Sequence, residues 1–210
     1  QGADCCGQIT SVGSAIDPAR IGERVLVRTM QEPLSVDGDL IPITLGSEID
    51  GAFAEYLSVR GSEAFVIDSP LDDADLASFP CSYSTAEGLL QRAQVGAERV
   101  LITGASGGVG SAAVQLAAMR GASVVAGTTG AHADDVKRIG AADTIDRASD
   151  LVDQLGDSSI DVVIDLVGGP HFESLLRVLR PGGRYAIAGA VAGAHVALDL
   201  RDLYLKDLTF

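Results

Sequence analysis

The fold of this chain is decided by the stretch Val100-Leu101-Ile102-Thr103-Gly104-Ala105-Ser106-Gly107-Gly108-Val109-Gly110. Its first four residues are apolar or β-branched and predict a buried strand. Glycines follow at 104, 107 and 110, and the next residues, 111–120, are helix-compatible. A strand, a glycine-rich turn and a helix in this order are typical of a turn that holds a pyrophosphate on backbone N–H groups.

Each of the three glycines has its own expected task. Gly104 can make the tight turn, Gly107 lets the backbone approach a phosphate because no Cβ intervenes, and Gly110 lets the helix pack closely on the strand. The spacing is G-x-x-G-x-x-G rather than G-x-G-x-x-G, so the flanking strand and helix carry the assignment. A tight turn without a ligand is the alternative, and the surrounding βαβ pattern favours cofactor binding.

Outward from this stretch, apolar strands alternate with amphipathic helices from Arg99 onward, which predicts a parallel sheet. We expect strands near 100–103, 123–127, 144–145, 161–165 and 184–188, with a sixth begun at Leu208. We expect helices near 109–120, 133–139 and 172–179. Gly121 and Gly140 stand where C-terminal helix glycines are found.

Residues 1–70 have a different character, with short β-like runs at 6–12, 24–28 and 53–59 separated by Gly, Pro and Asp. Residues 71–94 are helix-compatible, and the acidic cluster of Asp72, Asp73 and Asp75 is favourable near a helix N-terminus. The predicted fold class is therefore α/β, with a parallel sheet preceded by a mostly-β part.

Composition and charge exclude several classes of function. The 210 residues carry a net charge of −14, which argues against binding to a nucleic-acid backbone. The three cysteines form no disulfide framework, and the sequence contains neither a long apolar run nor a signal-peptide pattern. We expect a soluble, cytoplasmic protein with no membrane and no nucleic-acid partner.

Motifs along nearly the whole chain resemble, in order, those of the medium-chain dehydrogenase/reductase superfamily. In the first half they are Gly2-Ala3-Asp4 with Gly7 and Val12-Gly13, then Gly22-Glu23-Arg24-Val25, then Gly51-Ala52-Phe53-Ala54-Glu55-Tyr56. In the second half they are Cys81 to Ala86, Gly104 to Gly110, Gly140-Ala141, Asp165 to Gly169 and Leu179 to Gly183. The glycine loop is similar to that of the zinc-free, quinone-oxidoreductase-like branch.

This resemblance implies two domains. Residues 1–78 would be the later part of a mostly-β GroES-like catalytic domain. Residues 79–210 would be a Rossmann domain, a doubly wound parallel sheet, whose C-terminal part is missing. Both ends of the chain look cut. The resemblance also implies an NADPH-dependent oxidoreductase that moves hydride to a small-molecule carbonyl compound such as a quinone or enone, and a homodimer as the full-length form.

By resemblance, most site residues bind the cofactor, and no residue is identified as a catalytic general acid. The pyrophosphate side would consist of Gly104, Ala105, Ser106, Gly107, Gly108, Val109 and Gly110. The adenosine ribose side would consist of Thr128, Thr129 and Gly130, and the nicotinamide side of Thr85, Val167, Gly168, Gly189 and Ala190. Tyr83 would border the substrate.

Two other functions stay open, namely a zinc-dependent alcohol dehydrogenase and a non-catalytic NADPH-binding regulatory protein. Zinc-dependent relatives carry Gly-His-Glu where this chain has Gly2-Ala3-Asp4, and Ala3 offers no donor atom. Asp4 and Cys81 could still supply two donors, although we interpret Cys81 as a small buried hydrophobe. The three histidines lie far apart in the sequence, and we assign none of them to catalysis.

The end of the second predicted strand indicates NADPH rather than NADH. NAD-specific sites place an Asp or Glu there to accept hydrogen bonds from the ribose hydroxyls, whereas this chain has Gly127-Thr128-Thr129-Gly130. The nearest cationic candidates are His132, Lys137 and Arg138, with Asp134 and Asp135 between them. We expect NADPH to bind more tightly than NADH by about 1–2 kcal/mol, as one or two charge-assisted hydrogen bonds provide.

The loss of the zinc histidine leads to the first testable prediction. Because Ala3 replaces that donor, the purified protein should contain no stoichiometric zinc, and a chelator should leave its activity unchanged. Elemental analysis measures this directly. One tightly bound zinc per chain would contradict the zinc-free assignment.

Overall fold

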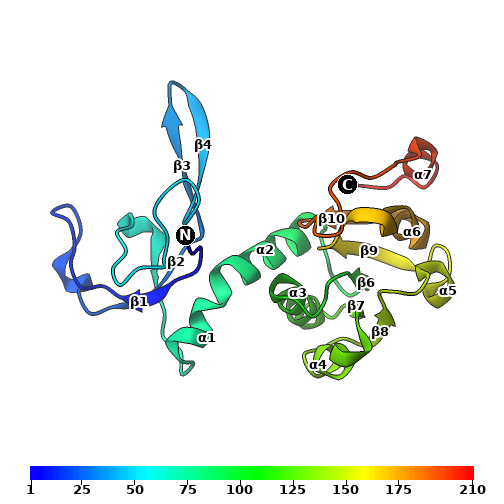
Figure 1. Cartoon of the computed structure of the whole chain (residues 1–210), viewed down its shortest axis with the longest axis horizontal. Coiled ribbons are helices and arrows are strands. Elements are labelled where there is room, and N and C mark those ends of the chain that lie inside the picture. The colour runs from blue at the N-terminus through cyan, green and yellow to red at the C-terminus, as the bar shows by residue number, and fades with distance from the viewer. The chain divides into compact units, whose positions relative to one another are not determined.

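The computed structural model describes residues 1–210, except for the side chain of Val36. The chain forms two compact units, Gln1–Ser84 and Thr85–Phe210, with the division inside helix α2 (Phe79–Arg92) (Figure 1). This division lies close to the predicted domain boundary between 78 and 79. The assignment of the domains themselves stays a prediction.

The second unit is built on a five-stranded sheet in the order β10-β9-β6-β7-β8, with all neighbouring strands parallel. The strands are β6 (Arg99–Ile102), β7 (Ser123–Thr128), β8 (Asp143–Asp146), β9 (Ile160–Asp165) and β10 (Leu179–Ile187). From β6 the chain winds outward through β7 and β8, then returns to the other side of β6 for β9 and β10. The strand order therefore reverses between β6 and β9, which is where open α/β sheets bind ligands.

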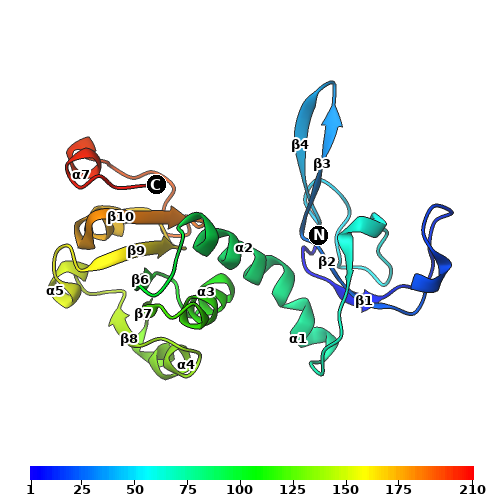
Figure 2. The same ribbon diagram turned by 180° about the vertical axis from the view of Figure 1, so that it is seen from behind.

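Helices cover both faces of this sheet. They are α3 (Gly108–Met119), α4 (Ala133–Arg138), α5 (Leu151–Leu155) and α6 (Phe172–Val178). A short helix near the C-terminus, α7 (Leu200–Leu205), has no buried residue. Because crossovers between parallel strands are right-handed, winding in opposite directions from β6 places α3 and α4 on one face and α5 and α6 on the other, as the two opposite views show (Figures 1 and 2). No helix in the described part of the chain is both long and apolar enough to cross a membrane.

The core of the second unit explains the continuous apolar runs of the sequence. A parallel sheet covered on both faces buries every strand position, so β6 and β9 read as apolar runs rather than as alternating patterns. On one face, the side chains of Leu101, Val163, Leu175 and Leu176 belong to one buried cluster. This packing fixes the carboxyl ends of β6 and β9 side by side.

The first unit is mostly β. It contains a three-stranded antiparallel sheet, in the order β1-β2-β5, and a separate hairpin of β3 and β4. The strands are β1 (Cys6–Gln8), β2 (Arg24–Val27), β3 (Met30–Val36), β4 (Asp39–Thr44) and β5 (Ala64–Val66), followed by α1 (Asp73–Ala77) and the start of α2. Asp72 caps α1, since its carboxylate accepts the N–H of Asp75 at 2.7 Å.

The sequence-based strands and helices of the second unit are confirmed to within a few residues, apart from β10, which begins earlier, at Leu179. The expected strand after Leu208 is present only as a parallel bridge between Arg184 and Thr209. Gly121 and Gly140 have φ values of +85° and +124°, as C-terminal helix glycines require. The short helices α5 and α7 were not predicted.

The first unit corrects two expectations. Residues 53–59 alternate in polarity but form no strand, and the side chains of Phe53 and Tyr56 are exposed. Alternation alone does not make a strand, because its backbone groups also need a partner. Conversely, the β3–β4 hairpin was not predicted, although Asp37-Gly38 is a hairpin turn signal, because each run contains a proline, Pro33 or Pro42, which argues against a strand.

Candidate functional site

The glycine loop has the geometry that the sequence predicts. It follows β6 directly and opens α3, whose N-cap is Gly107. Gly104 has a φ of +61°, a left-handed conformation that glycine adopts without strain. The N–H of Ala105 donates to the carbonyl of Gly127 at 3.2 Å and ties the loop to β7. Ser106, Gly107 and Gly108 are exposed, so the backbone at the start of α3 is open to a ligand.

The three glycines differ in what a side chain would meet. A Cβ at Gly110 would lie 2.1 Å from the carbonyl oxygen of Gly104, so the helix and the strand could not pack with any other residue there. A Cβ at Gly107 would meet only the same oxygen, at 3.4 Å, which is ordinary contact. Gly110 is therefore required by the fold, whereas the protein itself tolerates a side chain at Gly107.

Asp165 organises the point where the strand order reverses. It ends β9, and its carboxylate is fully buried. The hydroxyl of Thr103 donates to its Oδ1 at 2.5 Å and accepts the N–H of Leu166 at 2.9 Å. The N–H groups of Val167 and Gly168 donate to the same carboxylate at 2.9–3.2 Å. A buried carboxylate is costly unless such donors surround it, and here they come from the end of β6 and from the segment that follows β9.

Tyr185 on β10 adds a further donor. Its hydroxyl donates to Oδ2 of Asp165, and its ring is buried against Phe172 with centroids 5.5 Å apart. Burial, reinforced by the Asp165 carboxylate, raises the pKa of Tyr185 well above its usual value. The tyrosine therefore stays protonated and remains a hydrogen-bond donor, and β10 is held to the network of β6 and β9.

This network brings together the segments predicted for the nicotinamide side. Gly168 has a φ of +64°, and a Cβ there would lie 3.1 Å from the carbonyl oxygen of Gly189 and 3.3 Å from Cα of Ala190. A Cβ at Gly104 would lie 3.1 Å from Cγ2 of Val167, so the glycine loop adjoins the same segment. Residues 104–110, 167–168 and 189–190, far apart in the sequence, thus lie next to one another at the carboxyl ends of the strands.

The predicted ribose side lies at the carboxyl end of β7. Thr128 is 3% exposed, and its hydroxyl has no hydrogen-bond partner among the described residues. Thr129 is half-buried and Gly130 is exposed at the start of a short 3₁₀ turn, Gly130–His132. An unpaired buried hydroxyl costs free energy, so its place at a ligand-binding end of the sheet fits a site that is completed by a polar ligand.

Two predicted site residues lie in α2. Tyr83 stacks on Phe79, with ring centroids 4.3 Å apart, and belongs to the first unit. Thr85 is half-buried and belongs to the second unit. Their roles beside substrate and nicotinamide stay predictions.

The residues considered for zinc have other contacts. A carboxylate oxygen of Asp4 accepts the N–H of Cys81 at 2.6 Å, which caps the first turn of α2. Burial raises the pKa of the Cys5 and Cys6 thiols, so neither is an activated nucleophile. Within the described residues, no group of three or more His, Cys, Asp or Glu could hold a metal ion. The absence of zinc itself stays a prediction.

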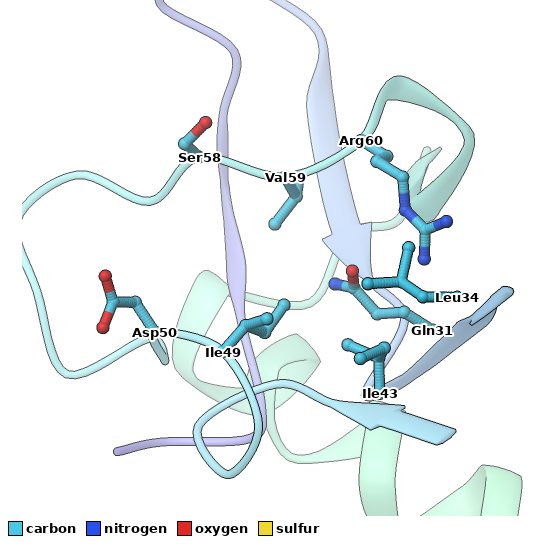
Figure 3. Close-up of a pocket in the computed structure, with 8 residues that line it drawn as sticks. All are labelled: Gln31, Leu34, Ile43, Ile49, Asp50, Ser58, Val59 and Arg60. Atoms are coloured by element: carbon cyan, nitrogen blue, oxygen red, sulfur yellow. The ribbon is translucent and has the colours of Figure 1, made fainter. Parts of the chain in front are cut away.

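A separate pocket lies in the first unit, beside the β3–β4 hairpin (Figure 3). Its volume is about 430 Å³, and its walls are Gln31, Leu34, Ile43, Ile49, Asp50, Ser58, Val59 and Arg60. The amide nitrogen of Gln31 is buried there without a hydrogen-bond partner. Arg60 is already held by the carbonyl of Glu32 and by the buried Glu63. None of the predicted site residues lines this pocket.

Sequence reasoning missed Thr103, Asp165 and Tyr185 as a unit, although Asp165 lies within a motif that carried the resemblance. The available signal was a carboxylate at the end of a strand whose other residues are almost all apolar. Such a residue is buried by the strand, so it needs several donors. The identity of these donors depends on the order of the strands in the sheet, which cannot be read from local sequence patterns.

Comparison with known proteins agrees with this geometry. Residues 108–210 match the family described as zinc-binding dehydrogenase. The crystal structure of a "putative alcohol dehydrogenase" from Sinorhizobium meliloti is 44% identical to this chain, with a TM-score of 0.91, and covers 100% of this chain and 60% of that one. The acryloyl-coenzyme A reductase of Metallosphaera sedula is 31% identical over 222 residues, covering 99% of this chain and 65% of the reductase.

A further similar structure contains bound NAD. The crystal structure of the Bacillus subtilis protein yhfP with NAD bound is 28% identical, with a TM-score of 0.78, and covers 99% of this chain and 61% of that one. The glycine loop, the reversal of strand order and these relatives all indicate the same family. The chain belongs to the medium-chain dehydrogenase/reductase superfamily.

The superfamily assignment confirms the resemblance and the α/β fold class that the sequence predicts. The chain spans less than two thirds of the length of each of these three relatives. The matched family carries zinc in its description, but its matched residues, 108–210, do not include Ala3, Asp4 or Cys81. This match therefore does not bear on the zinc ligands of medium-chain dehydrogenases/reductases.

The Asp165 network leads to a prediction about stability. Asp165→Asn replaces one acceptor oxygen by an amide N–H₂ group that faces other donors. We therefore expect the free energy of unfolding to fall by about 2–3 kcal/mol. Chemical denaturation measures this difference. Tyr185→Phe is the matched control, because it removes one donor, leaves the carboxylate with the others and should cost only about 1 kcal/mol. An unchanged free energy of unfolding for Asp165→Asn would show that this carboxylate does not hold the strand ends together.

Proposed function

We propose that this chain is the cofactor-binding part of an NADPH-dependent oxidoreductase that reduces an electron-poor carbonyl compound, such as a quinone or an enone. The proposal is supported by one main observation. Three backbone segments meet at the point of strand reversal, and the first of them presents exposed N–H groups at the start of a 12-residue helix.

The residues present fit a dinucleotide. The first N–H groups of α3 have no acceptor within the helix, and the missing Cβ of Gly107 leaves them accessible to a pyrophosphate. At the other end of the site, the Thr128 hydroxyl is buried without a partner, as expected where a ligand completes the hydrogen bonding. An acidic protein can hold this anion because the binding groups are local backbone dipoles.

Each part of the site has a task in the proposed reaction. Residues 106–109 would hold the pyrophosphate, and Thr128, Thr129 and Gly130 the adenosine ribose. Val167, Gly168, Gly189 and Ala190 would line the nicotinamide, in a position that the buried Asp165 carboxylate fixes. When bound, the cofactor supplies a hydride to an electron-poor carbon, and the protein contributes orientation and the exclusion of water.

The names of the relatives support the choice of substrate class. They include a quinone oxidoreductase of rat, 28% identical over 216 residues, and the acryloyl-coenzyme A reductase already mentioned. Both names fit hydride acceptors with an electron-poor carbon. By the same resemblance we propose that the protein acts as a homodimer on a small-molecule substrate in the cytoplasm.

The activity is tested with the purified protein. We expect NADPH oxidation, followed at its absorbance, in the presence of 1,2-naphthoquinone, phenanthrenequinone or a small enone. Omitting the acceptor gives the control. Tight NADPH binding without turnover of any acceptor would indicate the non-catalytic alternative, and alcohol-dependent reduction of the oxidised cofactor together with bound zinc would indicate an alcohol dehydrogenase.

The glycine loop gives a further prediction. Gly107→Val should weaken NADPH binding at least tenfold while changing the free energy of unfolding by less than about 1 kcal/mol, because the branched side chain enters the phosphate space and meets little protein. Gly110→Ala is the contrasting variant, since its Cβ would lie against a backbone oxygen and should destabilise the fold. Equal NADPH affinity in Gly107→Val and the parent protein would show that this loop does not bind the cofactor.

A further inference from the structure

The pocket beside the β3–β4 hairpin lies within the first unit and contains none of the proposed cofactor-binding residues. Its volume of about 430 Å³ is within the range of small-molecule sites. Figure 3 shows Gln31, Leu34 and Arg60 together at one end of the pocket and Asp50 at the other. Half of the lining side chains are aliphatic, namely Leu34, Ile43, Ile49 and Val59. The pocket therefore combines apolar walls with a few polar groups, as ligand sites do.

A β-bulge brings two side chains of β3 into this pocket. Gln31 and Leu34 are three residues apart, so in a regular strand they would face opposite sides. In the hairpin Gln31 pairs with Ile43 and Leu34 with Ile41, which leaves one extra residue on β3. The extra residue shifts the alternation, and both side chains line the pocket (Figure 3). The hairpin is thus bent in a way that presents an amide and an aliphatic side chain together.

The amide of Gln31 lacks the acceptor that a buried donor needs. Gln31 is 6% exposed, and its Nε2 has no hydrogen-bond partner among the described residues. A buried donor left unpaired costs free energy. The terminal amide turns about a broad, twofold torsion, so its N–H₂ group can face the pocket while the rest of the side chain stays in place. An acceptor oxygen bound in the pocket would remove this cost.

The guanidinium of Arg60 gives the same end of the pocket a positive charge. Its Nη2 donates to the carbonyl of Glu32 and lies 3.5 Å from a carboxylate oxygen of the buried Glu63. The other oxygen of that carboxylate lies 3.4 Å from Nε of Arg28, so two guanidinium groups share one negative charge. In the described part of the chain no further carboxylate pairs with either arginine. One positive charge therefore remains to be balanced, and Asp50 lies at the far end of the pocket (Figure 3).

We propose that this pocket binds a small aliphatic carboxylate, with its anionic group at Gln31 and Arg60 and its chain among the aliphatic side chains. A carboxylate suits these two residues because it has two acceptor oxygens and one negative charge, and can accept from an amide and a guanidinium at once. The aliphatic walls favour an apolar chain over a second polar group. Arg60 is partly exposed to solvent, which makes the charge contribution moderate. Binding here does not depend on the proposed function, because the pocket shares no residue with the cofactor-binding segments.

The experiment titrates hexanoate into the isotope-labelled protein and follows the backbone amide signals by NMR at one fixed pH and ionic strength. Hexanamide is the neutral analogue of similar shape, and hexylammonium is the cation with the same chain length. The variants are Arg60→Met, Gln31→Leu and Arg28→Met. Arg28→Met is the matched control, because Arg28 shares the Glu63 carboxylate with Arg60 but does not line the pocket.

We expect hexanoate to bind with a dissociation constant on the order of millimolar and to shift the signals of residues 31–34 and 58–60. Hexanamide should bind about tenfold more weakly, and hexylammonium should not shift these signals. Arg60→Met should weaken hexanoate binding about tenfold and Gln31→Leu at least about threefold, whereas Arg28→Met should change it by less than about twofold.

The proposal is overturned if hexanoate causes no shifts at millimolar concentration, or if its shifts lie outside the pocket. Equal affinities for hexanoate and hexanamide, or an equal loss in Arg28→Met and Arg60→Met, would overturn it as well. Chemical denaturation of each variant shows whether it is folded. If Arg60→Met does not fold, the comparison of hexanoate with hexanamide in the parent protein and in Gln31→Leu decides, since the preference for the carboxylate must be present in the parent and reduced in the variant.

Discussion

The hydrogen bonding of the buried Asp165 carboxylate is the constraint on which the candidate site depends. It collects donors from β6, from the segment after β9 and from β10, and so fixes the three chain segments that meet where the strand order reverses. Donors from a single strand would not have this effect, because they would move with it. A carboxylate that needs donors from three places penalises any displacement of one strand end relative to another.

The division of labour among the glycines follows from the same geometry. Gly110 and Gly189 are required by the protein, since a Cβ at either would lie 2.1 Å from a backbone oxygen. Gly107 is different, because the space beside it is not filled by the chain. A position that the fold leaves free, in a loop whose backbone is exposed at the start of α3, is where a ligand is expected. The glycines that look equivalent in the sequence therefore divide into structural and binding residues.

Charge at the site is arranged locally, against the overall acidity of the protein. The net charge of −14 does not prevent anion binding, because the N-terminus of α3 and a few side chains determine the potential near the phosphates. At the adenosine end, Asp135 offsets two of the cations that stand nearest in the sequence. Arg147 lies nineteen positions beyond the end of β7 in the chain, but its N–H donates to the carbonyl of Thr128 at that end of the sheet.

The sequence by itself determined the fold class, the strands and helices of the second unit, and the glycine loop, because each depends on patterns within a few residues. Residues 53–59 show the limit of such patterns, since their alternation found no partner strand and they remained irregular. Only the tertiary structure decided which residues adjoin at the sheet edge. Thr103, Asp165 and Tyr185 are joined through the strand order β10-β9-β6, and Arg147 adjoins Thr128 through the pairing of β7 with β8. Those contacts arise from burial of the whole sheet, which no local pattern records.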